Sequence, residues 1–416
     1  MKFKEDIFPL QMQAEIRNIW LRKRFDTILP MLMARENIDM WLVICREYNE
    51  DPVIMSLLPE PAMTARRRTI LVFHRTSDGS VDRYALDRYG YSGFYKPAWE
   101  PEQEPNQYLA LNKLIEKLNP QSIAINFSSL FAFGDGLSHT EYSALLGALS
   151  PSRMSNVHSG ERLVVGWLET RLPEEMEIYP KLVEMGHDLI REAFSRNVIQ
   201  PGLTDTTDVV WWMRQTMQDC GLSAWFQPSV DIQAKGQSYA VMAKRTRIMP
   251  GDLLHCDVGF HYLGLATDQQ QHAYVLAEGE SDAPAGLKAA LLAGNKLQDF
   301  HMANMAVGKT GNEVLSQTRE QAQEADIRPQ VYSHPLGYHG HGAGATIGLW
   351  DQQGGVPGNG DCLICDNTVW SIELNAVSAV PEWGNQDVRI ALEEDAVLRN
   401  GVCSWLDGRQ EAFHLI

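Results

Sequence analysis

Two aspartates interrupt an apolar pair of predicted β-strands, and this feature constrains the fold most strongly. Residues 253–258 and 273–276 have the composition of strands, and Asp257 and Asp268 lie in and between them. A hairpin centred near Tyr262-Leu263 places the two aspartates opposite each other, with Cβ atoms roughly 5 Å apart, where like charges destabilise a sheet. A cation between them is therefore predicted, and two divalent metal ions about 3.5–4 Å apart fit such a gap. The alternative is an exposed hairpin with both acids on its solvated face.

Length and charge limit the class of protein. The 416 residues are 44% hydrophobic, enough for more than one core, and the net charge of -17 argues against a general affinity for nucleic acid or an anionic membrane surface. The first residues lack the apolar core of a signal peptide, and no apolar run approaches the roughly 20 residues of a membrane span. We therefore expect a cytoplasmic protein that does not insert into a membrane.

The six cysteines are scattered along the chain, so reduced thiols are predicted. Cys362 and Cys365 form a C-x-x-C pair. This pair has no partner pair to complete a zinc site and no following helical pattern that would indicate a redox centre.

The first part of the chain predicts an α/β domain over residues 1–165. Apolar residues recur at helical spacing between Ile16 and Met33, although Pro30 should split that helix. Strands are predicted at 40–44, 69–73, 81–86 and 123–125, the middle two forming a hairpin. The boundary with the next domain is expected between residues 160 and 172.

Residues 166–416 predict an α+β catalytic domain. Helices are expected at 172–197, 204–220, 283–306 and 311–325. Strands are expected at 253–259, 271–276, 368–375 and 388–398. Helices and antiparallel strands in separate blocks are typical of this fold class.

Three further candidate metal ligands lie on or beside predicted strands. Alternation along residues 369–375 separates Glu373 from the apolar face of Trp370, Ile372 and Leu374. The same alternation separates Glu393 from Glu394, which shares a face with apolar residues, so Glu393 is the better candidate unless a bulge shifts the register. The segment HPLGYHGHGAG contains His334, His339 and His341 among glycines that allow close backbone approach.

This ordered set of residues resembles the pita-bread metallopeptidase family, which includes methionine aminopeptidase, aminopeptidase P, prolidase and the non-metal creatinase. The set is Asp, a second Asp eleven residues later, His in H-x-x-G with another His seven residues on, and Glu on each of two strands. The resemblance implies a C-terminal pita-bread catalytic domain and an N-terminal α/β creatinase-like domain. It also implies a dinuclear metal site made of Asp257, Asp268, His334, Glu373 and Glu393.

The resemblance further implies a dinuclear hydrolase of short peptides, cleaving at Xaa-Pro bonds with a metal-bridging hydroxide. Four carboxylates and a neutral imidazole balance two divalent ions, with manganese favoured over cobalt, zinc or iron. His341 would then hydrogen-bond the developing oxyanion, Glu373 would shuttle a proton, and Arg389 would bind a substrate carboxylate. The resemblance also implies a homodimer.

Several positions depart from the family pattern. The upstream substrate histidine falls at Ala240, beside Tyr239, and the histidine of Xaa-Pro-cleaving members falls at Gln330. The usual Thr-Arg after the second Asp is replaced near Gln270-Gln271, and Ala391-Leu392 look inserted before Glu393. Two alternatives therefore stay open. One is a creatinase-like hydrolase of a small amide or guanidino compound, and the other is a non-catalytic peptide-binding module.

Overall fold

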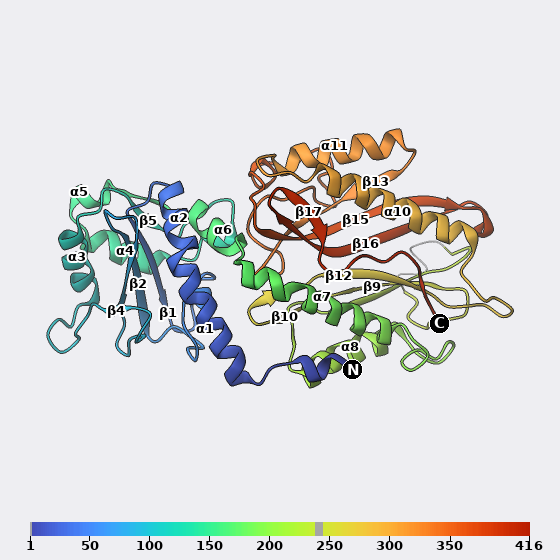
Figure 1. Ribbon diagram of the computed structural model, residues 1–416, viewed down its shortest axis with the longest axis horizontal. Helices are drawn as coiled ribbons and strands as arrows, with labels where there is room; N and C mark the ends of the chain where they lie inside the picture. The colour runs from blue at the N-terminus through green and yellow to red at the C-terminus, as the bar shows by residue number, and fades with distance from the viewer. Residues whose placement is uncertain (1, 238–243) are drawn as a thin grey trace. The chain divides into compact units, whose positions relative to one another are not determined.

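The computed structural model describes residues 2–237 and 244–416, which divide into two compact units (Figure 1). One unit is Pro9–Leu172, and the other combines the segment up to Phe8 with Pro173–Ile416. The division falls after residue 172, and the sequence predicts a boundary between residues 160 and 172. Helix α6 (Glu161–Glu169) belongs to the N-terminal unit, because its Trp167 is fully buried and stacks on Phe25 of that unit at 5.7 Å between ring centroids.

The N-terminal unit is a six-stranded mixed sheet with helices packed on it. Its strands lie in the order β4-β3-β2-β1-β5-β6. The strands are β1 (Met40–Arg46), β2 (Arg68–Arg75), β3 (Val81–Leu86), β4 (Lys96–Pro97), β5 (Ile123–Ile125) and β6 (Val157–Ser159). The other helices of this unit are α1 (Leu10–Asp26), α2 (Ile28–Arg35), α3 (Gln107–Leu118), α4 (His139–Ala148) and α5 (Pro151–Met154), with short 3-10 turns η2 (Ile54–Ser56) and η3 (Ala132–Gly134).

Two local predictions for this unit are confirmed. The first helical segment is split at Thr27, so Pro30 lies in the first turn of α2, where a missing backbone N–H leaves no helical bond unmade. Strands β2 and β3 form the expected hairpin, with Arg75 opposite Val81. The core between the sheet and α3 and α4 contains Leu42, Val72 and Leu111.

The C-terminal unit is built on a nine-stranded sheet with long helices and a separate three-stranded sheet. The main sheet follows the order β13-β15-β16-β12-β9-β8, with β14 also paired to β15, β17 to β16 and β18 to β12. Its strands are β8 (Ser229–Gln233), β9 (Leu253–Val258), β12 (Gln269–Tyr274), β13 (Arg328–Val331), β14 (His334–Leu336), β15 (Thr368–Val380), β16 (Gln386–Arg399), β17 (Val402–Trp405) and β18 (His414–Leu415). The small sheet consists of β7 (Ser223–Ala224), β10 (Phe260–Tyr262) and β11 (Leu265–Ala266).

The described helices of this unit are α7 (Pro173–Ala193), α8 (Thr206–Cys220), α10 (Ala285–Asn304) and α11 (Gly311–Glu324), with 3-10 turns η1 (Lys2–Asp6), η4 (Asn359–Asp361) and η5 (Pro381–Trp383). Each predicted helix is present, although α7 ends at Ala193, four residues before the expected end at residue 197. None of the helices in the described part of the chain has both the length and the apolar composition that crossing a bilayer requires.

The segment before Pro9 packs within the C-terminal unit. Phe3 of η1 is buried, the Phe8 N–H donates to the Tyr262 hydroxyl at 2.9 Å, and Asp6 forms an ion pair with Lys181 of α7. The apolar side chain and the two polar contacts together hold this short segment on the unit.

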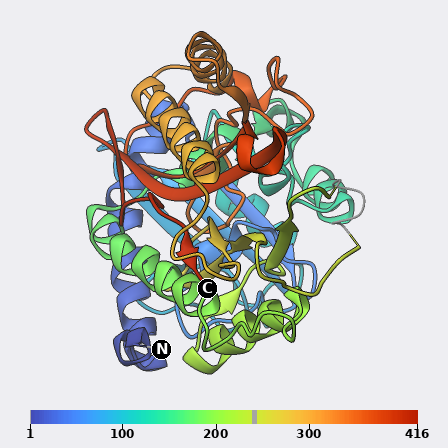
Figure 2. The ribbon, with the colours of Figure 1, turned by 90° about the vertical axis from the view of Figure 1, so that its right-hand side faces the viewer.

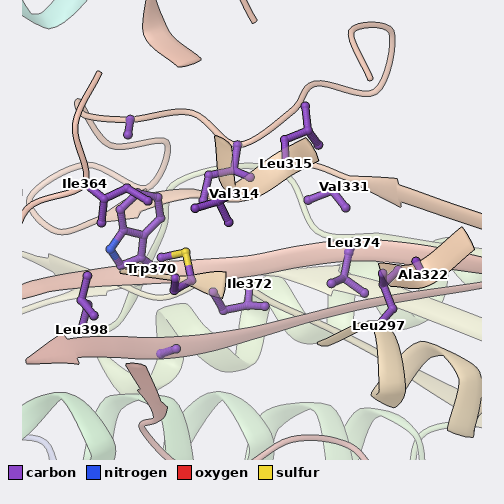
Figure 3. Packing of buried hydrophobic residues seen from close by; sticks show 14 of the residues in the cluster. Leu297, Val314, Leu315, Ala322, Val331, Ile364, Trp370, Ile372, Leu374 and Leu398 are labelled. Atoms are coloured by element: carbon purple, nitrogen blue, oxygen red, sulfur yellow. The ribbon is translucent and has the colours of Figure 1, made fainter. Parts of the chain in front are cut away.

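Strands β15 and β16 are the longest of the sheet, and one of their faces is covered by helices. Trp370, Ile372 and Leu374 of β15 join residues of α10 and α11 in one buried cluster, as Figure 3 shows. Figure 2 shows α10 lying against these strands from a second direction. The apolar face predicted from alternation is therefore confirmed, and the opposite face of the sheet is left for polar side chains.

The hairpin that carries the two aspartates has a different register from the predicted one. Leu263 and Gly264 have φ angles of 54° and 78°, so the turn is centred between them, one residue later than expected. A shift of the centre by one residue moves each cross-strand partner by two. Asp257 consequently lies opposite Gln270, and the predicted pairing of Asp257 with Asp268 is wrong.

All six cysteines are free, which confirms the prediction of reduced thiols. Cys362 and Cys365 lie in the segment after η4. Elsewhere in the chain, burial raises the pKa of the Cys256 and Cys403 thiols.

Candidate active site

A row of four polar side chains runs across four neighbouring strands of the main sheet. Glu373 of β15 lies opposite Glu393 of β16, Glu393 opposite Gln270 of β12, and Gln270 opposite Asp257 of β9. The directly opposed like charges are therefore Glu373 and Glu393. Such an arrangement destabilises a sheet unless something compensates it.

A second row lies beside the first on the same face. His334 of β14 is opposite Ser371, and Ser371 is opposite Asp395. The backbone N–H of Asp268, just before β12, donates to the Asp395 carboxylate at 3.3 Å. The two rows bring Asp268 and His334 next to the glutamates, although these residues are far apart in the sequence.

The five residues named in the resemblance form one cluster. His334 Nε2 lies 3.8 Å from Asp268 Oδ2, 3.8 Å from Glu393 Oε1 and 4.0 Å from Glu373 Oε2. Asp257, Asp268 and Glu393 also present three oxygens within 4.8 Å of one another. These separations leave room for a cation between the side chains rather than for direct hydrogen bonds.

Burial and mutual repulsion disfavour the charged carboxylates. Burial raises the pKa of Asp257, Asp268 and Glu373 well above the usual range, and the neighbouring Glu393 charge raises each further. Burial also raises the pKa of Glu393 to about 7, and burial lowers the pKa of His334 to about 3. The imidazole is thus neutral, the form that binds a metal ion.

The donor set fits divalent metal ions. Asp257 Oδ1, Asp268 Oδ1 and His334 Nε2 are buried atoms without a hydrogen-bond partner among the described residues. Within the same part of the chain, no lysine or arginine forms an ion pair with any of the four carboxylates. Buried charge of one sign requires a partner, and carboxylates with an imidazole suit manganese, iron, cobalt or zinc.

His341 lies beside the cluster in the glycine-rich turn. Its ring meets that of His334 edge to face at 4.8 Å between centroids, and it lies 5.0 Å from Trp225. A Cβ at Gly340 would lie 2.2 Å from the Trp225 ring, and one at Gly342 would lie 2.4 Å from the Pro335 carbonyl oxygen. The predicted close backbone approach is confirmed, and it holds an exposed His341 at the edge of the cluster.

Arg389 is exposed on β16, on the same face as Glu393. Its backbone is fixed by the Gln233 side chain, which accepts from the Arg389 N–H at 3.0 Å and donates to its carbonyl at 2.7 Å. The Arg389 charge also helps to lower the pKa of Asp231, after the larger effect of His255. Arg389 is thus outside the buried cluster, on an exposed part of the same face of the sheet.

Two positions carry another residue where the family pattern has a substrate histidine, and one of them lies in the described part of the chain. Gln330 accepts from Asn375 Nδ2 at 3.1 Å and donates to the Trp350 carbonyl at 2.6 Å, so its amide is held by the protein. It lines a cavity of about 420 Å³ with Asn375 and Gln353. Ala240 and Tyr239 lie outside the described residues.

The register of β15 and β16 is unbroken around Ala391 and Leu392, so they form no bulge. Glu394 lies opposite Ile372 and points to the helix-covered face, where it accepts from His187 Nε2 at 2.6 Å and Gln271 Nε2 at 2.8 Å. Glu393 alone of the adjacent pair belongs to the cluster.

Gln270, Ser371 and Asp395 also belong to this site, and the sequence pattern did not predict them. Gln270 comes two residues after Asp268, Ser371 two residues before Glu373, and Asp395 two residues after Glu393. Residues two apart on a strand point to the same face of the sheet. A polar residue two positions from a predicted ligand is therefore the signal by which all three could be predicted.

Comparisons with known proteins show which family and which fold this chain resembles. The sequence model of metallopeptidase family M24 matches residues 179–400. A Mycoplasma pneumoniae protein named "Putative Xaa-Pro aminopeptidase" is 23% identical over 242 residues, which cover 58% of this chain and 62% of that protein. The aligned region thus spans about three fifths of that curated relative.

Solved structures show the same two-domain fold. The X-Pro aminopeptidase of Thermotoga maritima has a TM-score of 0.65 at 15% identity, covering 93% of this chain and all of that one. Zn-substituted Escherichia coli aminopeptidase P has a TM-score of 0.63 at 14% identity, covering 93% and 95%. The Xaa-Pro dipeptidase of Bacillus anthracis has a TM-score of 0.59 at 16% identity, covering 97% and 100%. The expected pita-bread architecture with a preceding α/β domain is confirmed.

Proposed function

Because this chain belongs to metallopeptidase family M24, we propose that its cluster binds two divalent metal ions and that the protein hydrolyses short peptides. The observation that carries this proposal is the buried cluster of four carboxyl groups, whose charged forms would have no cationic partner in the part of the chain that the structure describes. Four carboxylates surround one neutral imidazole without a cationic side chain paired to them in the described residues. Two divalent ions would neutralise that charge, with Asp257, Asp268, His334, Glu373 and Glu393 as ligands.

Divalent ions held there would supply a hydroxide nucleophile near neutral pH and polarise the scissile carbonyl. Glu373 would hold a proton on its carboxylate and pass it to the leaving amine. His341, exposed beside His334, would donate a hydrogen bond to the oxygen on which negative charge develops. Arg389 would pair with a substrate carboxylate from the solvent side.

Xaa-Pro peptides are the substrate class that we propose. Support comes from the names of the similar proteins and from the exposed Arg389, which suits short substrates whose free carboxylate lies close to the scissile bond. The amide of Gln330 is already engaged by Asn375 and Trp350, so it offers a substrate less than a free imidazole would. We therefore expect slow turnover of ordinary Xaa-Pro dipeptides and tripeptides.

Metal analysis and a peptide panel test this function. Protein purified without chelator should contain about two metal ions per chain, and Mn(II), Co(II) or Zn(II) should restore activity after chelation. Asp268→Asn should lose metal and hydrolysis and stay folded. Asp387→Asn, which alters an exposed acid paired with Arg328, is the control and should keep both. Faster turnover of a creatine-like amide by metal-free protein would overturn the proposal.

Manganese as the native ion, a homodimeric assembly and a cytoplasmic location stay predictions. Elemental analysis of the isolated protein and its mass in solution by light scattering test the first two.

A further inference from the structure

Gln270 occupies the centre of the candidate metal site without being one of its ligands. It is buried in the row between Glu393 and Asp257. Its Nε2 lies 2.7 Å from Glu373 Oε1 and 2.7 Å from Glu393 Oε2. Since a side-chain amide nitrogen carries two hydrogens, both are used, one for each glutamate.

These two hydrogen bonds distinguish the oxygens of each glutamate. In Glu373 the oxygen bonded to Gln270 is Oε1, and Oε2 is the one that faces His334 Nε2. In Glu393 the oxygen bonded to Gln270 is Oε2, whereas Oε1 faces His334 Nε2 and also accepts from the Ser371 hydroxyl. The Gln270 amide thus engages one oxygen of each carboxylate and leaves the other oxygen on the side of His334.

The orientation of the amide is itself determined by a neighbour. Gln270 Oε1 lies 2.9 Å from His255 Nε2, and because that oxygen only accepts, the imidazole donates. A flipped amide would place its oxygen 2.7 Å from two carboxylate oxygens. The other ring nitrogen of His255, Nδ1, lies 3.7 Å from Asp231 Oδ2, at the exposed end of this chain of contacts.

We propose that Gln270 is a positioning residue that selects which oxygen of Glu373 and of Glu393 binds the metal ions, and that His255 holds its amide in the required orientation. This inference rests on the proposed function. Hydrogen bonds to metal ligands fix ligand geometry, and their removal typically weakens metal binding by about 10- to 100-fold.

The adjacent Gln271 provides a matched control. It is equally buried and points to the other face of the sheet, where Nε2 donates to Glu394 Oε1 at 2.8 Å and Oε1 lies 2.8 Å from His414 Nε2. Both glutamines therefore link a histidine to a glutamate. They differ in that the glutamates bonded to Gln270 belong to the cluster and Glu394 does not.

The test compares Gln270→Met, Gln271→Met and His255→Met in the full chain. Methionine matches the length of glutamine without its hydrogen bonds, and at residue 255 it removes the imidazole that donates to Gln270. Mn(II) affinity is measured by calorimetry, and the visible spectrum of Co(II)-loaded protein reports ligand geometry. Gln270→Met should bind Mn(II) about 10- to 100-fold more weakly and show an altered Co(II) spectrum. Gln271→Met should keep affinity and spectrum, and His255→Met should change both in the direction of Gln270→Met by a smaller factor.

Equal affinity and an equal spectrum for Gln270→Met and the wild type would overturn the inference and leave the proposed function intact. An equal loss in Gln271→Met would also overturn it, because the effect would then be a general loss of stability. If Gln270→Met does not fold, His255→Met carries the test, and an unchanged Co(II) spectrum refutes the positioning role. Absence of Mn(II) binding by the wild-type chain would refute both the function and the inference.

Discussion

Replacing Glu394 by glutamine should lower the stability of the C-terminal unit without lowering its metal affinity. Glu394 is fully buried and accepts from His187 Nε2 at 2.6 Å, and His187 Nδ1 lies 2.8 Å from Asp407 Oδ2. Burial opposes the charge on His187, but the two carboxylates outweigh it and raise the pKa of His187 to about 9. The imidazolium is therefore part of the folded state at neutral pH.

The size of the effect follows from that pKa. An unfolded histidine titrates near pH 6.5, so a folded pKa of about 9 corresponds to about 3 kcal/mol of stability. The contribution is fully present below about pH 6.5 and is lost as the pH rises through 9, leaving about 2 kcal/mol at pH 7.5 and less than about 0.5 kcal/mol at pH 9. These values are upper limits for Glu394→Gln, because Asp407 still pairs with His187 in that variant.

Thermal unfolding of metal-free protein between pH 6 and pH 9 measures this difference. For a unit of this size about 3 kcal/mol corresponds to a fall in Tm of roughly 6–12 °C, so the gap between wild type and Glu394→Gln should be largest at pH 6, at or below that value, and should nearly vanish at pH 9. Glu393→Gln is the contrasting variant, and it should lose metal because its oxygens belong to the cluster. A Tm gap that is absent at pH 6, or that widens toward pH 9, would refute the reasoning.

Three further results are expected. His341→Ala should lower kcat about 10- to 100-fold with little change in KM, because its hydrogen bond strengthens in the transition state, and steady-state kinetics on Xaa-Pro peptides would contradict this if KM alone rose. Arg389→Met should raise KM about tenfold for dipeptides and less for longer peptides, and an equal rise for both would exclude a carboxylate contact. Removing metal with a chelator should lower the free energy of unfolding by about 3–4 kcal/mol, compared with protein in a solution whose free metal concentration is 100 to 1,000 times Kd. An unchanged Tm in calorimetry would contradict metal binding at the cluster.

Parity along β15 and β16 was sufficient to predict which glutamates face the polar side of the sheet. Side chains alternate with a period of two, and the apolar partners Trp370 and Ile372 identify the covered face without knowledge of the neighbouring strands. The same reasoning separated Glu393 from Glu394, because no bulge interrupts the ladder.

Hairpin register required information that alternation does not contain. The conformation of Leu263 and Gly264 decides where the turn is centred, and both have positive φ. The sequence also gives no direct sign that β16 lies between β15 and β12, which is the condition for Gln270 to reach two glutamates. The amide at the centre of the cluster therefore looked like a mere departure from the family pattern.

The placement of the first residues has a consequence for how this chain reaches its folded state. Phe3 and the Phe8 N–H pack within the C-terminal unit, so the N-terminal unit is, in topological terms, an insertion into its neighbour. Asp6 and Phe8 are synthesised long before Lys181 and Tyr262, so their contacts can form only after those later residues have been made. A fragment that begins at Pro173 would lack this piece of its own unit. A separate peptide of residues 2–8 would lose more entropy on binding to that fragment than the same segment loses when it is covalently attached.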